Sequence, residues 1–150
     1  MRTKTIIQIL QTSDVHGYIY PTSYTTKLPE DLGLAKLSTL INSLRNKNTI
    51  LIDTGDTIQG SPFTYYHYKE HNKEVNPIAN IFNEMKYDYV SIGNHEFNYG
   101  KEYLLNHFRY IDATILNSNL LDSHTNNPFV GVTHDITEID GYFIGIIGVT

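Results

Sequence analysis

The segment Thr49-Ile50-Leu51-Ile52-Asp53-Thr54-Gly55-Asp56 changes character halfway along its length. Its first half, Thr49–Ile52, is a short apolar run rich in β-branched residues, which is typical of a strand buried on both faces. Its second half holds two carboxylates and a glycine. A buried strand that ends abruptly in polar residues is typical of an α/β protein, because such sheets bind ligands at the carboxyl ends of their strands.

Two other segments have the same arrangement of an apolar run followed by polar residues. The apolar run within 5–11 precedes Asp14-Val15-His16-Gly17, and Tyr89–Ile92 precedes Gly93-Asn94-His95-Glu96. Since the carboxyl ends of parallel strands meet at one edge of a sheet, the three polar groups are expected to lie together.

Helix signals separate these strands along the chain. An amphipathic stripe predicts a helix over Leu34–Leu44, and the cap-proline pairs Ser61-Pro62 and Asn76-Pro77 each predict the start of another helix. A further helix is expected over Gly100–Phe108 and a further strand over Ala113–Leu116. Alternation of strands and helices predicts an α/β fold with a parallel sheet. The runs 133–139 and 142–149 flank Asp140-Gly141, a two-residue hairpin turn. The hairpin adds antiparallel pairing, so we expect a mixed, mostly parallel sheet.

Composition sets limits on the class of protein. The chain has 150 residues, which fits one domain, and its net charge is −5 with only 11 lysines and arginines. A nucleic-acid polymer is therefore not an expected partner, because binding one requires a basic surface. The absence of cysteine excludes disulfides, thiolate metal sites and cysteine nucleophiles.

No apolar run approaches the roughly 18 residues of a transmembrane helix, so no membrane segment is expected. The start Met1-Arg2-Thr3-Lys4 resembles the basic end of a signal peptide, but the following apolar run is short and interrupted by Gln8. No signal peptide is therefore predicted. The localisation stays open between the cytoplasm and a mature exported form.

The polar groups after the three strands contain carboxylate, imidazole and amide ligands. Such donors suit Mn, Zn, Fe or Co rather than a metal that prefers thiolates. The candidate residues are Asp14, His16, Asp56, Asn94 and His95. Taken alone, Asp56 fits a turn carboxylate equally well, and His95 fits a structural histidine; their shared position after strands favours a metal site.

Two other motifs need a separate interpretation. Asp122-Ser123-His124 also reads Asp-x-His, but it lies in an asparagine-rich region and is interpreted as surface polar residues. The stretch His67-Tyr68-Lys69-Glu70-His71 matches the H-x-x-E-H pattern of inverted zinc proteases. Because the segment is polar and lacks a long apolar stripe, a solvated helix face is favoured, and both histidines are expected to lie away from the metal site.

In order, Asp-x-His, Gly-Asp-x-x-x-Gly and Gly-Asn-His-Glu resemble the calcineurin-like metallophosphoesterases. The strings Gly55-Asp56-Thr57-Ile58-Gln59-Gly60-Ser61-Pro62 and Gly93-Asn94-His95-Glu96-Phe97-Asn98-Tyr99-Gly100 are similar to the group of 5'-nucleotidases and 2',3'-cyclic-nucleotide phosphodiesterases. The resemblance implies an αββα sandwich, of which residues 1–150 form the N-terminal part. It also implies a hydrolase that cleaves phosphate esters of nucleotides with water activated by two divalent metal ions.

The resemblance assigns a role to each candidate residue. Asp14 and His16 would hold the first metal ion, Asp56 would bridge both ions, and Asn94 would hold the second. His95 would stabilise charge on the phosphate or protonate the leaving oxygen. The nucleotide itself would be the substrate.

Three neighbouring residues are expected to support these ligands. Asn98 stands where 5'-nucleotidase relatives typically have an aspartate that orients the histidine, and this favours the cyclic-nucleotide phosphodiesterase branch. Asp53 is expected to support the ligands or to form a turn, and Glu96 to cap backbone N–H groups.

In the family, later histidines and a substrate domain complete the enzyme, and nothing in this chain matches them. The alternative is therefore a non-catalytic remnant or fragment that keeps the fold and binds at most one metal ion.

Overall fold

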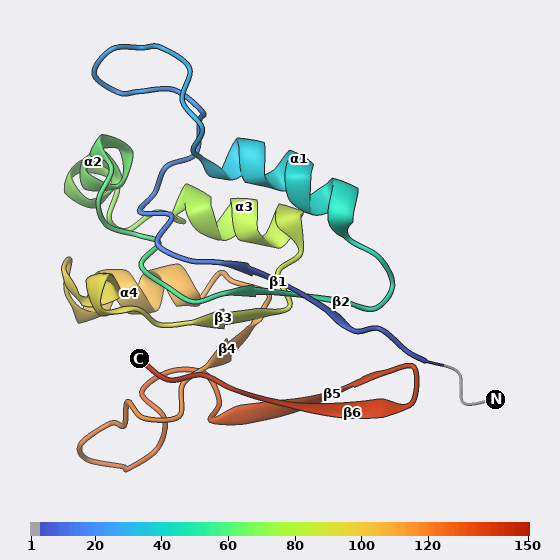
Figure 1. Cartoon of the computed structure of the whole chain (residues 1–150). Helices are drawn as coiled ribbons and strands as arrows, with labels where there is room; N and C mark the ends of the chain where they lie inside the picture. Colours follow the sequence, from blue (N-terminus) through green and yellow to red (C-terminus); the bar gives the residue numbers. More distant parts are fainter. Residues whose placement is uncertain (1–3) are drawn as a thin grey trace.

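The computed structural model describes residues 4–150, and it arranges them in layers (Figure 1). Residues 1–3, which include most of the basic start considered above, lie outside the described residues. In chain order the elements are β1 (Gln8–Thr12), α1 (Leu34–Leu44), β2 (Thr49–Asp53), α2 (Pro62–Glu70), α3 (Pro77–Met85), β3 (Tyr89–Ser91), the short 3₁₀ helix η1 (Asn94–Phe97), α4 (Lys101–Phe108), β4 (Thr114–Leu116), β5 (His134–Ile139) and β6 (Tyr142–Ile147).

The expected helices and strands are present, with small shifts at their ends. Both cap-proline pairs begin helices as predicted: the Ser61 hydroxyl accepts the N–H of Thr64 at the start of α2, and the Asn76 amide accepts the N–H of Ile78 at the start of α3. The helix η1 was not predicted. It begins directly after β3 and contains His95.

Four parallel strands form the central sheet in the order β1-β2-β3-β4. Leu10 pairs with Leu51, and Val90 pairs with Ile115. Because all four strands run in the same direction, their carboxyl ends meet at one edge, called the carboxyl edge from here on. The α/β prediction with a parallel sheet is therefore confirmed.

Helices cover one face of this sheet, with α1 and α3 side by side above it (Figure 1). The main core lies between helices and sheet and includes fully buried residues from α1, α3, β2 and α4: Leu34, Ile78, Phe82, Leu51 and Leu104. Burial of these side chains supplies most of the driving force for this layer, at roughly 1.5–3 kcal/mol for each large apolar residue.

The β5–β6 hairpin covers the opposite face. Asp140 and Gly141 both have positive φ, as a tight two-residue hairpin turn requires. The hairpin is a separate two-stranded sheet, so the expectation of one mixed sheet is corrected. The reason lies in burial: one side of the hairpin, including Ile144 and Ile146, packs on the sheet residues Ile50, Tyr89 and Leu116 instead of adding to an edge.

The layers are thus helices, parallel sheet and hairpin sheet, which agrees with the predicted sandwich. The outer side of the hairpin exposes Ile136, Phe143 and Ile147 to solvent. Within residues 4–150, no helix is long and apolar enough to cross a membrane.

Candidate metal centre

Two loops at the carboxyl edge lie side by side and hydrogen bond to each other. The N–H of Asp14 donates to the carbonyl of Gly55 (3.0 Å), and the N–H of His16 donates to the carbonyl of Asp56 (2.9 Å). The loop after β1 is therefore registered on the loop after β2, and this registration fixes where their side chains meet.

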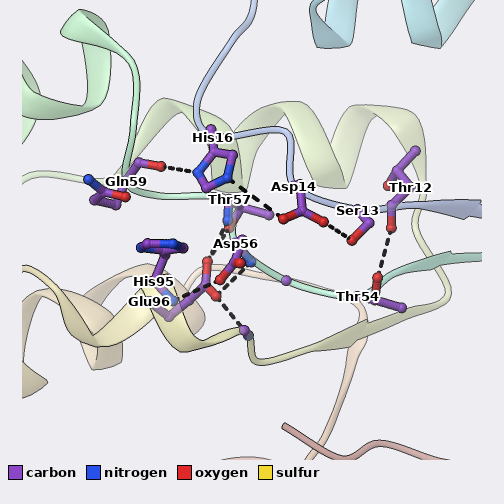
Figure 2. Close-up of polar contacts among 12 residues, drawn as sticks. Thr12, Ser13, Asp14, His16, Thr54, Asp56, Thr57, Gln59, His95 and Glu96 are labelled. Atoms are coloured by element: carbon purple, nitrogen blue, oxygen red, sulfur yellow. Dashed lines mark hydrogen bonds and ion pairs between the residues drawn. The ribbon is translucent and has the colours of Figure 1, made fainter.

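Asp14, His16 and Asp56 converge at this edge (Figure 2). Each offers one ligand atom, and the three atoms lie within 4.8 Å of one another. His16 Nε2 lies 3.7 Å from Asp14 Oδ1. Two carboxylates and one imidazole at such separations fit a divalent cation, because the anionic oxygens need a positive charge between them. The predicted convergence of these three residues is confirmed.

The backbone at all three residues is in the left-handed region. The φ angles are 54° at Asp14, 47° at His16 and 59° at Asp56. Residues other than glycine adopt this conformation at a cost of about 1–3 kcal/mol, and such residues concentrate at functional sites. The left-handed backbone at these three residues therefore lowers the stability of the fold, and it directs their side chains toward one another.

The tautomer of His16 is set by its hydrogen bond to the backbone. His16 Nδ1 lies 2.7 Å from the carbonyl oxygen of Gln59, which can only accept, so Nδ1 carries the proton. Nε2 is left with a free lone pair that faces Asp14. Gly60, at φ 132°, permits this approach, because a Cβ there would lie 2.7 Å from the His16 Cβ. This is the arrangement that orients a metal-binding histidine.

His95 is brought to the same place by η1. Its N–H donates to Asp56 Oδ1 at 2.7 Å, and its ring lies edge-on to that of His16, with centroids 5.3 Å apart. Asn98 Nδ2 lies 3.0 Å from His95 Nδ1. Since an amide nitrogen only donates, this contact places the ring proton on Nε2 of His95.

Asn94 lies between two residues that touch the Asp56 carboxylate. It is exposed at the start of η1 and follows Gly93, where any side chain would collide with Asp56. The backbone thus brings Asn94 next to the cluster, while its role as a ligand stays a prediction.

Asp53, the last residue of β2, is fully buried. Its carboxylate accepts the Thr12 hydroxyl (2.5 Å) and the N–H of Gly55 (2.9 Å). Burial raises the pKa of Asp53 to about 7, against the lowering effect of these two hydrogen bonds. Through these two hydrogen bonds the Asp53 carboxylate ties β1 to the turn that precedes Asp56. This fits a supporting role and not that of an exposed ligand.

Glu96 is also fully buried, and the sequence indicated only part of its role. As expected, its carboxylate caps η1 by accepting the N–H of Gly93. It also accepts backbone N–H groups from the loop after β2, forty residues away (Figure 2). The only sequence signal for this role was an acidic residue beside His95.

The competing motifs lie elsewhere. His67 Nδ1 is paired with the hydroxyl of Tyr103 on α4, and His71 is paired with Glu74. Neither belongs to the Asp14–His16–Asp56 group, as predicted. The expectation of a solvated helix face is wrong for His67, which is buried because α2 packs this side against α4. The Asp122 carboxylate accepts N–H groups of its own loop, including that of His124.

Together these features define an α/β protein with a candidate cation site of carboxylates and imidazole at the carboxyl edge of a parallel sheet. Residues 7–146 match the family model described as calcineurin-like phosphoesterase, and the chain belongs to this family.

Known proteins are similar to this chain in sequence and in fold. The chain is 36% identical, over 82% of its length, to a 2',3'-cyclic-nucleotide 2'-phosphodiesterase/3'-nucleotidase of Haemophilus influenzae, of which it spans 20%. It is 31% identical, over 96% of its length, to a 5'-nucleotidase of Rattus norvegicus, of which it spans 26%. The crystal structure of the calcineurin-like phosphoesterase YfkN from Bacillus subtilis superposes with a TM-score of 0.81, at 32% identity, over 95% of this chain and 48% of that one.

Proposed function

We propose that the protein containing this chain hydrolyses phosphate esters of nucleotides with the help of two divalent metal ions. The observation that supports this most is the convergence of Asp14, His16 and Asp56, with ligand atoms within 4.8 Å, in a chain of the calcineurin-like phosphoesterase family. When bound, such ions neutralise phosphate oxygens and lower the pKa of water.

Each residue has a role that follows from its contacts. Asp14 and the free Nε2 of His16 would hold the first ion, because both face the same space. Asp56 would bridge the two ions, and Asn94 would contribute its amide oxygen to the second. The His95 N–H already occupies one side of Asp56 Oδ1, so the orientation of the carboxylate is fixed before any ion binds.

His95 would act on the substrate and not on the metal. The contact with Asn98 leaves a proton on Nε2, where it can be donated to a phosphate or leaving-group oxygen. The ring lies beside that of His16, so this donor sits next to the proposed metal position.

The neutral partner of His95 supports a preference for 2',3'-cyclic nucleotides and 3'-nucleotides over 5'-nucleotides. Asn98 holds the ring by an amide contact, where a carboxylate would stabilise an imidazolium. The identity to the Haemophilus influenzae phosphodiesterase/3'-nucleotidase, 36%, exceeds that to the Rattus norvegicus 5'-nucleotidase, 31%, which points the same way.

The rest of the protein would complete the site. The second ion would have only Asp56 and Asn94 from these residues, and a site with two ligands binds a cation weakly. We therefore expect residues 1–150 alone to be inactive and to bind at most one ion. The remaining ligands would come from the rest of the catalytic domain, and a further domain would hold the nucleotide.

The test is hydrolysis by the whole protein after removal and return of metal ions. Activity on a chromogenic phosphodiester and on 2',3'-cyclic nucleotides should disappear with a chelator and return with Mn²⁺. Asp14→Ala should reduce it strongly, whereas Asp122→Ala, the matched control in the other Asp-x-His motif, should not. Metal-independent hydrolysis, or equal effects of the two substitutions, would contradict the proposal.

A further inference from the structure

Glu96 has an unusual environment for a carboxylate, because it is fully buried and, within residues 4–150, no lysine or arginine is among its hydrogen-bond donors. Its partners are four backbone N–H groups and one hydroxyl. Oε2 accepts the N–H of Asp56 (2.8 Å) and of Gly93 (2.7 Å). Oε1 accepts the N–H of Thr57 (2.5 Å), the Thr57 hydroxyl (3.1 Å) and the N–H of Ile58 (3.4 Å).

These five contacts exclude a direct chemical role for Glu96. A carboxylate offers about four lone-pair positions, and here both oxygens are already taken. The side chain therefore has no free position for a metal ion or for a proton from the substrate. What remains is its effect on the groups that it binds.

One of those groups is the backbone N–H of Asp56, a proposed metal ligand, and two more are the N–H groups of the residues that follow it, Thr57 and Ile58. Asp56 has a φ of 59°, and this left-handed residue turns the successive N–H groups of Asp56, Thr57 and Ile58 toward one point. Consecutive N–H groups in such a turn form an anion-binding concavity. In this protein the internal carboxylate of Glu96 fills it, which offsets the cost of the conformation.

A second contact joins the same two segments, with the Asp56 side chain now as the acceptor and a backbone N–H of η1 as the donor. Glu96 binds the backbone of Asp56, while the Asp56 carboxylate binds the N–H of His95, the residue before Glu96. Backbone and side chain of Asp56 are thus both fixed by η1. The loops after β2 and β3 are joined by this pair of contacts, although they are about forty residues apart.

We infer that Glu96 is a positioning residue that sets the Asp56 carboxylate, and with it His95, for metal binding. The inference rests on the proposed function, since Asp56 is there the bridging ligand. Glutamine in place of Glu96 would have the same size, but its NH₂ would face N–H donors, so part of the concavity would lose its acceptor. Aspartate would keep the charge but fall short of one loop.

The experiment is calorimetric titration of Mn²⁺ into the whole protein and its Glu96→Gln, Glu96→Asp and Glu102→Gln variants. Glu102 is exposed on α4 and serves as the matched control. We expect both Glu96 variants to raise the Mn²⁺ dissociation constant by roughly 10–100-fold, the usual effect of losing a group that orients a ligand. The control should bind like the wild type.

Circular dichroism and thermal unfolding separate positioning from folding. A purely structural role would lower the unfolding midpoint and leave the Mn²⁺ dissociation constant of the folded variant unchanged, and this result would overturn the inference. If Glu96→Gln does not fold, Glu96→Asp decides by the same criterion. Failure of the wild type itself to bind Mn²⁺ would instead contradict the proposed function, and the role of Glu96 with it.

Discussion

Two pairs of histidines occupy opposite environments in this molecule. His16 and His95 lie at the carboxyl edge of the sheet, where each has Nδ1 held by a neighbour and Nε2 left for a ligand. His67 and His107 lie buried between helices α2 and α4. Among residues 4–150, neither ring nitrogen of His107 has a hydrogen-bond partner, and His67 is bonded through Nδ1 alone.

The difference shows that the surroundings of a histidine decide its use. Burial lowers the pKa of His107 to about 3, so this ring stays neutral and acts as a packed apolar group. At the carboxyl edge the rings are partly exposed, lie beside Asp14 and Asp56, and keep one nitrogen available. A motif that names histidines, such as H-x-x-E-H, contains no information about this distinction.

The largest effect is expected at the bridging position. Asp56→Ala should lower the activity of the whole protein by at least roughly 10²–10³-fold at every Mn²⁺ concentration, because both ions lose a ligand. Asn94→Ala removes one neutral ligand from one ion, so excess Mn²⁺ should partly restore the activity. The measurement is turnover against Mn²⁺ concentration, and equal losses that Mn²⁺ restores in neither variant would contradict the bridging role.

A second pair of substitutions should separate the two histidine regions. His16→Gln should weaken Mn²⁺ binding by roughly 10–100-fold with little effect on stability. His67→Gln should leave Mn²⁺ binding unchanged and lower the free energy of unfolding by about 1–3 kcal/mol, because it disturbs the buried contact with Tyr103. Calorimetric titration and urea unfolding of both variants test this. The distinction fails if His67→Gln also weakens Mn²⁺ binding.

The buried region should also determine how stability depends on pH. An unfolded histidine titrates near 6.5, whereas the pKa of His107 in the fold is about 3. Between these values the unfolded chain binds a proton that the folded chain does not, so the contribution of His107 is complete above pH 6.5. It should be lost as the pH falls toward 3, by up to about 1.4 kcal/mol per pH unit.

The variant His107→Leu isolates this contribution from the other titrating groups. Asp53 has the opposite sign, since its raised pKa of about 7 makes the fold less stable as the pH rises from 3.8 to 7. The difference in unfolding free energy between wild type and variant removes the effect of Asp53. This difference should shift in favour of the variant below pH 6.5, and a difference that does not change with pH would refute the assignment.

The smallest effect is expected from Asn98→Asp at the carboxyl edge. A carboxylate would accept a hydrogen bond from the Nδ1–H of a protonated His95 and stabilise the charged ring, where Asn98 now holds a neutral one. Because the imidazole itself is retained, turnover should change by less than about tenfold. The ratio of activity on 5'-nucleotides to activity on 2',3'-cyclic nucleotides should rise, and an unchanged ratio would remove Asn98 from the account of specificity.

Local signals explain why the strands, the helices and the meeting of Asp14, His16 and Asp56 could be predicted. β-Branched runs, cap-proline pairs and the Asp140-Gly141 turn act within a few residues, and parallel strands bring their ends together. Long-range contacts were not predictable in the same way. The Asp140-Gly141 turn indicated a hairpin, but not that the hairpin would cover the parallel sheet as a second layer.

The candidate site shows the same limit. The ligand types and their order are visible in the sequence, but the bond from His16 to the Gln59 carbonyl and the contacts of Glu96 join residues about forty positions apart. His67 was misjudged because α2 is polar and rich in tyrosine, and its buried side is evident only once α4 packs against it.

Paramagnetic broadening by Mn²⁺ in amide-resolved NMR of residues 1–150 tests the central claim most directly, because it reports on both histidine regions at once. The account predicts that substoichiometric Mn²⁺ first removes the amide signals of the loops around His16, Asp56 and His95. The signals of His67, His71 and His107 should persist. Loss of signal centred on α2, or uniform loss without a centre, would contradict a metal site at the carboxyl edge.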